Sequence, residues 1–122
     1  MHILKSLFLL LILLPSIASA QDMILFNGGI GADERESAPE AGTRLVFFVE
    51  SGSYLSDVSV TVENMSGEEL MNTRTNGPWL ILDLPAGEYQ IRAEVDQDRA
   101  QGGVIVVNEG ESQEFAYRFT DQ

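Results

Sequence analysis

Cysteine is absent from this chain of 122 residues, and histidine and lysine occur once each. The lack of cysteine excludes disulfide bonds and a thiol nucleophile. His2 and Lys5 both lie within the first 20 residues. Without that segment, the chain cannot build a Ser-His-Asp triad, a Schiff base or a metal site with histidine ligands.

Basic side chains are scarce in the rest of the chain as well. Residues 21–122 contain six arginines and all 19 aspartates and glutamates, which gives a formal net charge of 6 − 19 = −13. A strongly negative chain tends to be soluble, and nucleic acids and anionic lipids repel it. We therefore expect no nucleic-acid partner. The length fits a single domain with a small core.

A long apolar run occurs only near the N-terminus, where residues 1–20 have the pattern of a signal peptide. Lys5 supplies a positive charge, residues 7–14 are all apolar, and residues 18–20 form a small-residue cleavage site. The run is too short to cross a bilayer comfortably. We expect export, cleavage after Ala20 and no membrane insertion of the mature chain.

Residues 43–122 show the alternation of apolar and polar residues that is typical of an antiparallel β-sandwich. One face of the first segment carries Leu45, Phe47 and Val49, for example. Polar residues 69–75 are expected at a sheet edge, and residues 96–103 are expected as a loop. The seven expected strands are 43–50, 58–63, 69–75, 79–84, 88–95, 104–107 and 114–120.

The centre of this pattern is a predicted hairpin over residues 75–95. A turn precedes an apolar strand, and a Pro-Ala-Gly turn then leads into a strand with one face toward a core. A tryptophan that begins an apolar strand is expected in the core. The residues that define the hairpin motif are Gly77, Pro78, Trp79, Leu84, Pro85, Gly87 and Tyr89.

The segment Asp83-Leu84-Pro85-Ala86-Gly87-Glu88-Tyr89 resembles the carboxypeptidase regulatory-like domains. The resemblance covers residues 44–119 and implies an all-β, seven-stranded antiparallel Ig-like or transthyretin-like (prealbumin-like) sandwich. It implies no particular activity, because this fold carries many unrelated functions. Residues 28–35 and 77–79 also resemble a group of small exported bacterial proteins, which implies a periplasmic or secreted location.

Residues 21–42 are expected to form a flexible leader. The apolar patch at residues 23–26 either docks on the sandwich, pairs with an edge strand or contacts a partner. The glycines lack the Gly-Lys-Ser/Thr sequence of a phosphate-binding loop. Residues 32–40 are expected as one or two helical turns or as a charged loop. The candidate interaction residues are Gly28, Gly29, Gly31, Glu34 and Arg35.

Two further ligand sites have weak support in the sequence. Asp96 and Asp98 offer oxygen ligands for Ca²⁺, although the Asp-Gln-Asp sequence is more typical of a hairpin turn in water. The spacing of an EF-hand is absent. Trp79 and Tyr54 are candidates for an aromatic sugar-binding platform.

These features predict an exported, non-catalytic module that mediates a protein interaction. The expected partner is another envelope protein or a second copy of the chain, and no cofactor is expected. An enzyme is not expected, because a domain of this size has little room for a cleft with paired catalytic carboxylates. The alternative function is binding of a small ligand, a glycan or Ca²⁺.

Overall fold

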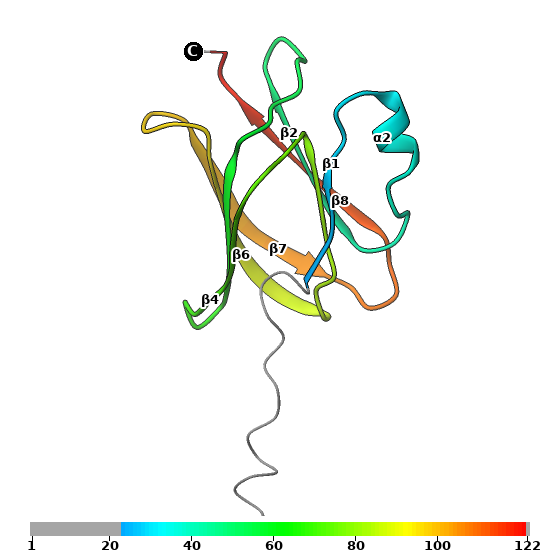
Figure 1. Cartoon of the computed structure of the whole chain (residues 1–122). Helices are drawn as coiled ribbons and strands as arrows, with labels where there is room; N and C mark the ends of the chain where they lie inside the picture. The colour runs from blue at the N-terminus through cyan, green and yellow to red at the C-terminus, as the bar shows by residue number, and fades with distance from the viewer. Residues whose placement is uncertain (1–22, 122) are drawn as a thin grey trace, which may run out of the picture.

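The computed structural model describes residues 23–121, which form an all-β fold with one short helix at its side (Figure 1). The predicted signal peptide and its cleavage site lie outside these residues. The described part contains no helix that is long and apolar enough to cross a membrane. The elements are β1 (Ile24–Gly28), α2 (Ala32–Glu36), β2 (Thr43–Val49), β3 (Ser59–Asn64), β4 (Glu69–Arg74), β5 (Trp79–Leu82), β6 (Gly87–Glu94), β7 (Ala100–Val107) and β8 (Gln113–Phe119).

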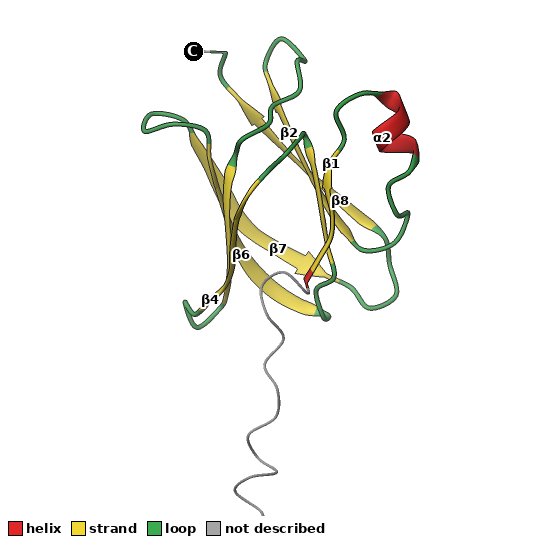
Figure 2. Cartoon of the chain, in the orientation of Figure 1, coloured by secondary structure: helices red, strands yellow, loops and turns green. Residues whose placement is uncertain are grey.

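The strands form two four-stranded sheets, which lie as two layers (Figure 2). Sheet A has the strand order β1-β5-β2-β8, and sheet B has the order β4-β3-β6-β7. All neighbouring strands are antiparallel except β2 and β8, which are parallel from Thr43 opposite Gln113 to Val49 opposite Phe119. The expected all-β class with two largely antiparallel sheets is therefore confirmed.

The core lies between the two sheets and is built from alternate residues of their strands. Sheet A contributes Leu45, Phe47 and Leu80, while sheet B contributes Val60 and Ile91, and all five are buried. The strand faces that the sequence predicted to be apolar are the faces that pack here. Each large apolar side chain that is fully removed from water contributes about 1.5–3 kcal/mol to stability.

The number of strands differs from the expected seven. The described residues contain eight strands, because residues 24–28 pair with β5 and do not form a flexible leader. Ile24 lies opposite Leu82, Phe26 lies opposite Ile81, and the register shifts between the two pairs. This bulge adds one residue to β1 and breaks the two-residue alternation by which a strand is recognised in a sequence. The two-sheet unit thus begins at β1 and not at residue 43.

The second difference concerns β7, which begins at Ala100 and includes four residues that were expected as a loop. Gly102 and Gly103 stand in the middle of this strand, opposite Arg92 and Ile91. A Cβ atom on Gly102 would lie 2.6 Å from the carbonyl oxygen of Ile91. The glycine therefore permits close pairing of β6 and β7, whereas glycine in a sequence usually indicates a turn.

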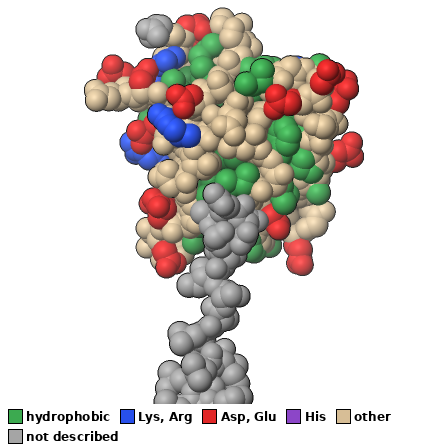
Figure 3. All heavy atoms as spheres, in the orientation of Figure 1, with side chains coloured by type: hydrophobic (Ala, Val, Ile, Leu, Met, Phe, Trp, Pro, Cys, Tyr) green, Lys and Arg blue, Asp and Glu red, His purple; other side chains and the backbone are tan. Residues whose placement is uncertain are grey.

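The edges of the sheets differ in how much backbone they leave open. β4 is an edge strand, as its polar composition predicted. The edges β7 and β8 are joined by glutamine side chains: Gln101 donates to the carbonyl of Arg118 (3.0 Å), and Gln113 donates to that of Val106 (2.9 Å). These bonds block addition of a strand on that side. Acidic side chains are dispersed over the visible face of the molecule (Figure 3).

Tyr89 stabilises the turn of the predicted hairpin motif. The tyrosine ring is buried in the core, and its hydroxyl donates a hydrogen bond of 2.6 Å to the carbonyl oxygen of Pro85. A tyrosine hydroxyl is protonated at neutral pH, and burial raises the pKa of Tyr89 further above its ordinary value. The bond fixes the turn between β5 and β6, and Leu84 is buried beside it.

We predict that Tyr89→Phe lowers the free energy of unfolding by about 1 kcal/mol, because the ring stays buried while one hydrogen bond is lost. Urea denaturation measures this change. Tyr54→Phe, on an exposed ring, is the matched control and should change stability by less than about 0.5 kcal/mol. Equal stability of the two variants would show that the bond does not hold the turn.

Candidate functional site

The outer face of sheet A is covered by the segment that connects β1 to β2. Residues 29–42 and helix α2 lie outside this sheet, away from sheet B (Figure 1). Ile81 is buried although its side chain lies on the outer face of sheet A. Gly42 packs against it so closely that a Cβ atom on this glycine would lie 3.2 Å from the Ile81 side chain. The connecting segment therefore acts as a second layer over sheet A.

Trp79 lies in this outer layer, and its predicted place in the core is wrong. The ring is half-buried and does not belong to the cluster of buried residues between the sheets. Trp79 alternates with Leu80, whose side chain fills the inner face of β5. The Arg44 guanidinium lies over the ring at 4.1 Å from its centroid, and Arg44 also pairs with Glu114 at 2.6 Å. Arg44 therefore occupies the ring face that a sugar would stack on.

The candidate interaction residues that the sequence singled out do come together, around the peptide of Gly29. The Glu34 carboxylate accepts a hydrogen bond from the Gly29 amide (3.1 Å). The Arg35 guanidinium donates one to the Gly29 carbonyl (2.8 Å). Gly29 has a φ of 95° and would place a Cβ atom 3.2 Å from Trp79. Two neighbouring side chains of α2 thus bind the backbone N–H and C=O groups of Gly29. The positive φ at this position favours glycine, because other residues adopt it only with strain.

Gly28, at the end of β1, packs against the turn that precedes β5. A Cβ atom on Gly77 would lie 2.3 Å from the carbonyl oxygen of Gly28, so the two backbones touch. The Asn27 side chain donates to the carbonyl of Arg74 (3.0 Å) and accepts from the amide of Asn76 (2.7 Å). The Gly77-Pro78-Trp79 segment and the glycine-rich segment, which are about 50 residues apart in sequence, therefore form one structure.

A hollow of about 250 Å³ opens beside Gly29, at the end of the sandwich. Ile30 and Tyr54 stand at its rim with 60% and 53% of their surfaces exposed. The Arg35 guanidinium lies 5.0 Å from the centroid of the Tyr54 ring, which is within the range of a cation–π contact. We call this hollow the Arg35 pocket, and it is lined by Gly29, Ile30, Gly31, Arg35, Tyr54, Leu55, Ser56 and Pro78.

Sequence analysis identified only part of this pocket. Gly29, Gly31 and Arg35 belong to it, while Gly28 and Glu34 support it from behind. Ile30 was not among the predicted residues. An isoleucine between two glycines is nevertheless a weak signal of an exposed apolar side chain, because no helix or strand is expected there to bury it. The contact of Tyr54 with Arg35 leaves no sign in the sequence, since Arg35 lies on helix α2 and Tyr54 lies in the loop after β2.

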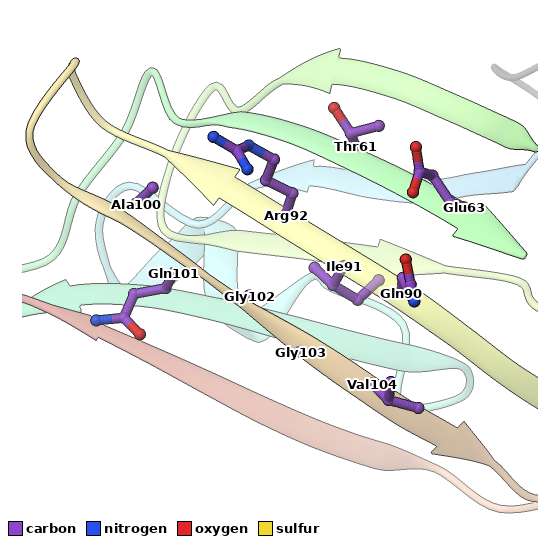
Figure 4. A pocket seen from close by; sticks show the side chains of 10 residues that line it. All are labelled: Thr61, Glu63, Gln90, Ile91, Arg92, Ala100, Gln101, Gly102, Gly103 and Val104. Carbon is purple, nitrogen blue, oxygen red and sulfur yellow. The ribbon is translucent and has the colours of Figure 1, made fainter. Parts of the chain in front are cut away.

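A larger hollow of about 430 Å³ lies on the outer face of sheet B (Figure 4). It follows the glycines of β7, where Gly102 and Gly103 carry no side chain beside Gln90 and Val104 (Figure 4). Its one guanidinium, that of Arg92, is engaged by the Glu94 carboxylate. The arginine of this open face therefore already has a carboxylate partner.

The weak candidates for Ca²⁺ have a structural role. One carboxylate oxygen of Asp96 accepts hydrogen bonds from the amides of Asp98 (3.0 Å) and Arg99 (2.9 Å). The other oxygen pairs with the Arg99 guanidinium at 2.9 Å, and this bond lowers the pKa of Asp96. Both oxygens hold the turn between β6 and β7. Within residues 23–121, no group of three acidic or histidine side chains is close enough to hold a metal ion.

No protein-family model matches this chain, and no curated protein is significantly similar to it. The pocket itself is thus the basis for a functional proposal.

We predict that Gly77→Ala separates β1 from the turn before β5 and exposes Trp79. The added methyl would meet the Gly28 backbone, so we expect a loss of about 2 kcal/mol or more in unfolding free energy. Trp79 is the only tryptophan, so its fluorescence emission should move to longer wavelength as Gly29 withdraws from the ring.

Gly67→Ala is the control for Gly77→Ala. Gly67 has a φ of 85° and open space around it, so an alanine there strains the backbone by about 1 kcal/mol without touching the outer layer. Its Trp79 emission should match that of the original protein. Identical emission from both variants would contradict the proposed contact between Gly28 and Gly77.

Proposed function

We propose that this protein is an exported, non-catalytic binding module that contacts a partner protein through the Arg35 pocket. The observation that carries the proposal is that two exposed side chains, Ile30 and Tyr54, line the same hollow as Arg35. Tyrosine and arginine are enriched among the residues that dominate binding energy at protein interfaces. An isoleucine that is 60% exposed beside them gives the pocket an apolar rim.

The size of the pocket favours a partner protein over a free small ligand. Pockets that enclose small molecules typically measure about 300–1,000 Å³, whereas this one measures about 250 Å³ and is open to solvent. One side chain of a partner fits such a space, and the exposed rim then adds contact area around it. The sheet edges at β7 and β8 are closed by glutamines, so strand addition there has less support.

The alternative function, binding of a glycan or Ca²⁺, has less support from the geometry. The ring of Trp79 lies under Arg44, and Arg35 lies over the ring of Tyr54. The Asp96 carboxylate is already engaged by Arg99. A non-catalytic role has the support of composition, since residues 21–122 lack histidine, lysine and cysteine.

We extend the proposal to fold family and location. A transthyretin-like sandwich of the carboxypeptidase regulatory-like type has the support of the two four-stranded sheets and of the Pro85 turn that Tyr89 closes. Export to the periplasm or to the outside of the cell has the support of the signal-peptide pattern in residues 1–20. The partner in that location would be another envelope protein.

Site-specific crosslinking in living cells tests the proposed contact. A photoreactive residue replaces Tyr54 in the full precursor, which is expressed in its native host and irradiated. We expect one dominant crosslinked protein. The same residue at Met65, which is 49% exposed in the turn between β3 and β4, is the control and should give no such product.

The proposal also predicts that Ile30→Asp reduces the yield of the Tyr54 crosslink at least about tenfold, because it places a charge on the apolar rim. The circular dichroism spectrum should stay unchanged. Absence of a product at Tyr54, or the same product at Tyr54 and Met65, would contradict binding through the Arg35 pocket.

A further inference from the structure

We infer that the Arg35 pocket recognises the C-terminal residue of the partner polypeptide, by its free carboxylate and its apolar side chain. The inference rests on the proposed function and adds the chemical group that is bound. Four of the six arginines in residues 23–121 have a carboxylate within 4.0 Å, and the other two are Arg35 and Arg118. Arg118 is exposed to solvent, whereas Arg35 is half-buried. The lack of such a partner for Arg35 within these residues is unexpected in a chain with 19 acidic residues.

The position of the Arg35 guanidinium is fixed by groups that leave its charge unpaired. One N–H group donates to the Gly29 carbonyl at 2.8 Å, and the Cζ atom lies over the Tyr54 ring at 5.0 Å from its centroid. A guanidinium has five N–H donors, so most of them stay available to a ligand. Because the side chain is half-buried and held at two points, it loses little further entropy when a carboxylate binds.

The acidic residues next to Arg35 do not occupy this position. The Glu34 carboxylate turns toward the Gly29 amide, at 3.1 Å. Asp33 and Glu36 are exposed on α2, in contact with solvent. Within the described residues, the guanidinium therefore faces the hollow without a carboxylate of its own chain.

The other walls of the pocket decide which carboxylate fits. Ile30 and Leu55 contribute apolar side chains to the lining, and Ile30 is the more exposed of the two. A ligand that satisfies both the guanidinium and these side chains needs a carboxylate and an apolar body close together. The last residue of a polypeptide offers both when its side chain is apolar, while an internal aspartate or glutamate offers only the carboxylate. The volume of about 250 Å³ is suited to a single residue.

The charge of the domain restricts the ligand further. Residues 21–122 contain 19 acidic side chains and six arginines, and acidic side chains are dispersed over the face shown in Figure 3, so a segment with several carboxylates would be repelled. At physiological ionic strength this repulsion is screened beyond about 8 Å, so a single carboxylate in contact with Arg35 is affected mainly by its nearest neighbours. We therefore expect selection for one terminal carboxylate and against acidic tails.

Nuclear magnetic resonance titration with three small probes tests the inference on the mature chain. N-acetyl-leucine carries a terminal carboxylate and an apolar side chain. N-acetyl-leucinamide lacks the carboxylate, and N-acetyl-aspartic acid α-amide carries a side-chain carboxylate instead. N-acetyl-leucine should bind with a dissociation constant on the order of 1 mM and shift the amide signals of Gly29, Ile30 and Gly31. The other probes should bind at least about tenfold more weakly.

Two variants identify the group that is responsible. Arg35→Gln should abolish the shifts caused by N-acetyl-leucine. Arg118→Gln, which removes an exposed arginine on β8 outside the pocket, should leave them unchanged. Equal binding of the amide probe or of the aspartyl probe would overturn the inference. Shifts that persist in Arg35→Gln, or an absence of shifts in the original protein, would overturn it as well.

The inference and the proposed function fail in different experiments. If the crosslink at Tyr54 forms but Arg35→Gln leaves its yield unchanged, the pocket binds a partner without using the carboxylate, and only the inference is wrong. If no crosslink forms at Tyr54, the proposed function itself is wrong.

Discussion

The contact between the Gly28 and Gly77 backbones is the constraint on which the candidate site depends. It brings the start of the described chain against the turn that precedes the central strand β5. With β1 held there, the glycine-rich segment must turn back over sheet A, where Trp79 and Arg44 support it. Arg35 then reaches the Gly29 carbonyl and the Tyr54 ring. The contact between Gly28 and Gly77 thus orients the half-buried Arg35 side chain in its pocket.

Much of the fold was predictable because two-residue alternation is a direct consequence of a sheet with one buried face. The strand with Tyr89, Ile91 and Ala93 on one face is an example. β1 was not predictable in this way, since its bulge interrupts the alternation between the two faces of sheet A. The glycines of β7 misled the prediction for another reason: they serve a close approach between strands, and glycine more often marks a turn.

The candidate site was predictable only in part, because local sequence shows special residues but not their neighbours. Glycines next to Glu34 and Arg35 indicated a distinct segment. Their clamp on Gly29 depends on a glycine with positive φ, and the sequence does not show which glycine adopts it. Trp79 was assigned to the core because it begins an apolar strand and a tryptophan in a sandwich is usually buried there. Its ring instead lies on the outer face of sheet A, under Arg44.

Hydrogen exchange at the Gly29 amide tests most directly whether the site is rigid before any partner binds. The amide is buried and bonded to the Glu34 carboxylate, so we predict exchange at least about 100-fold slower than in an unstructured peptide. The same measurement should show protection across β1 where it pairs with β5. Exchange at the rate of an unstructured peptide would show that residues 24–42 are a flexible leader and would contradict the preformed site.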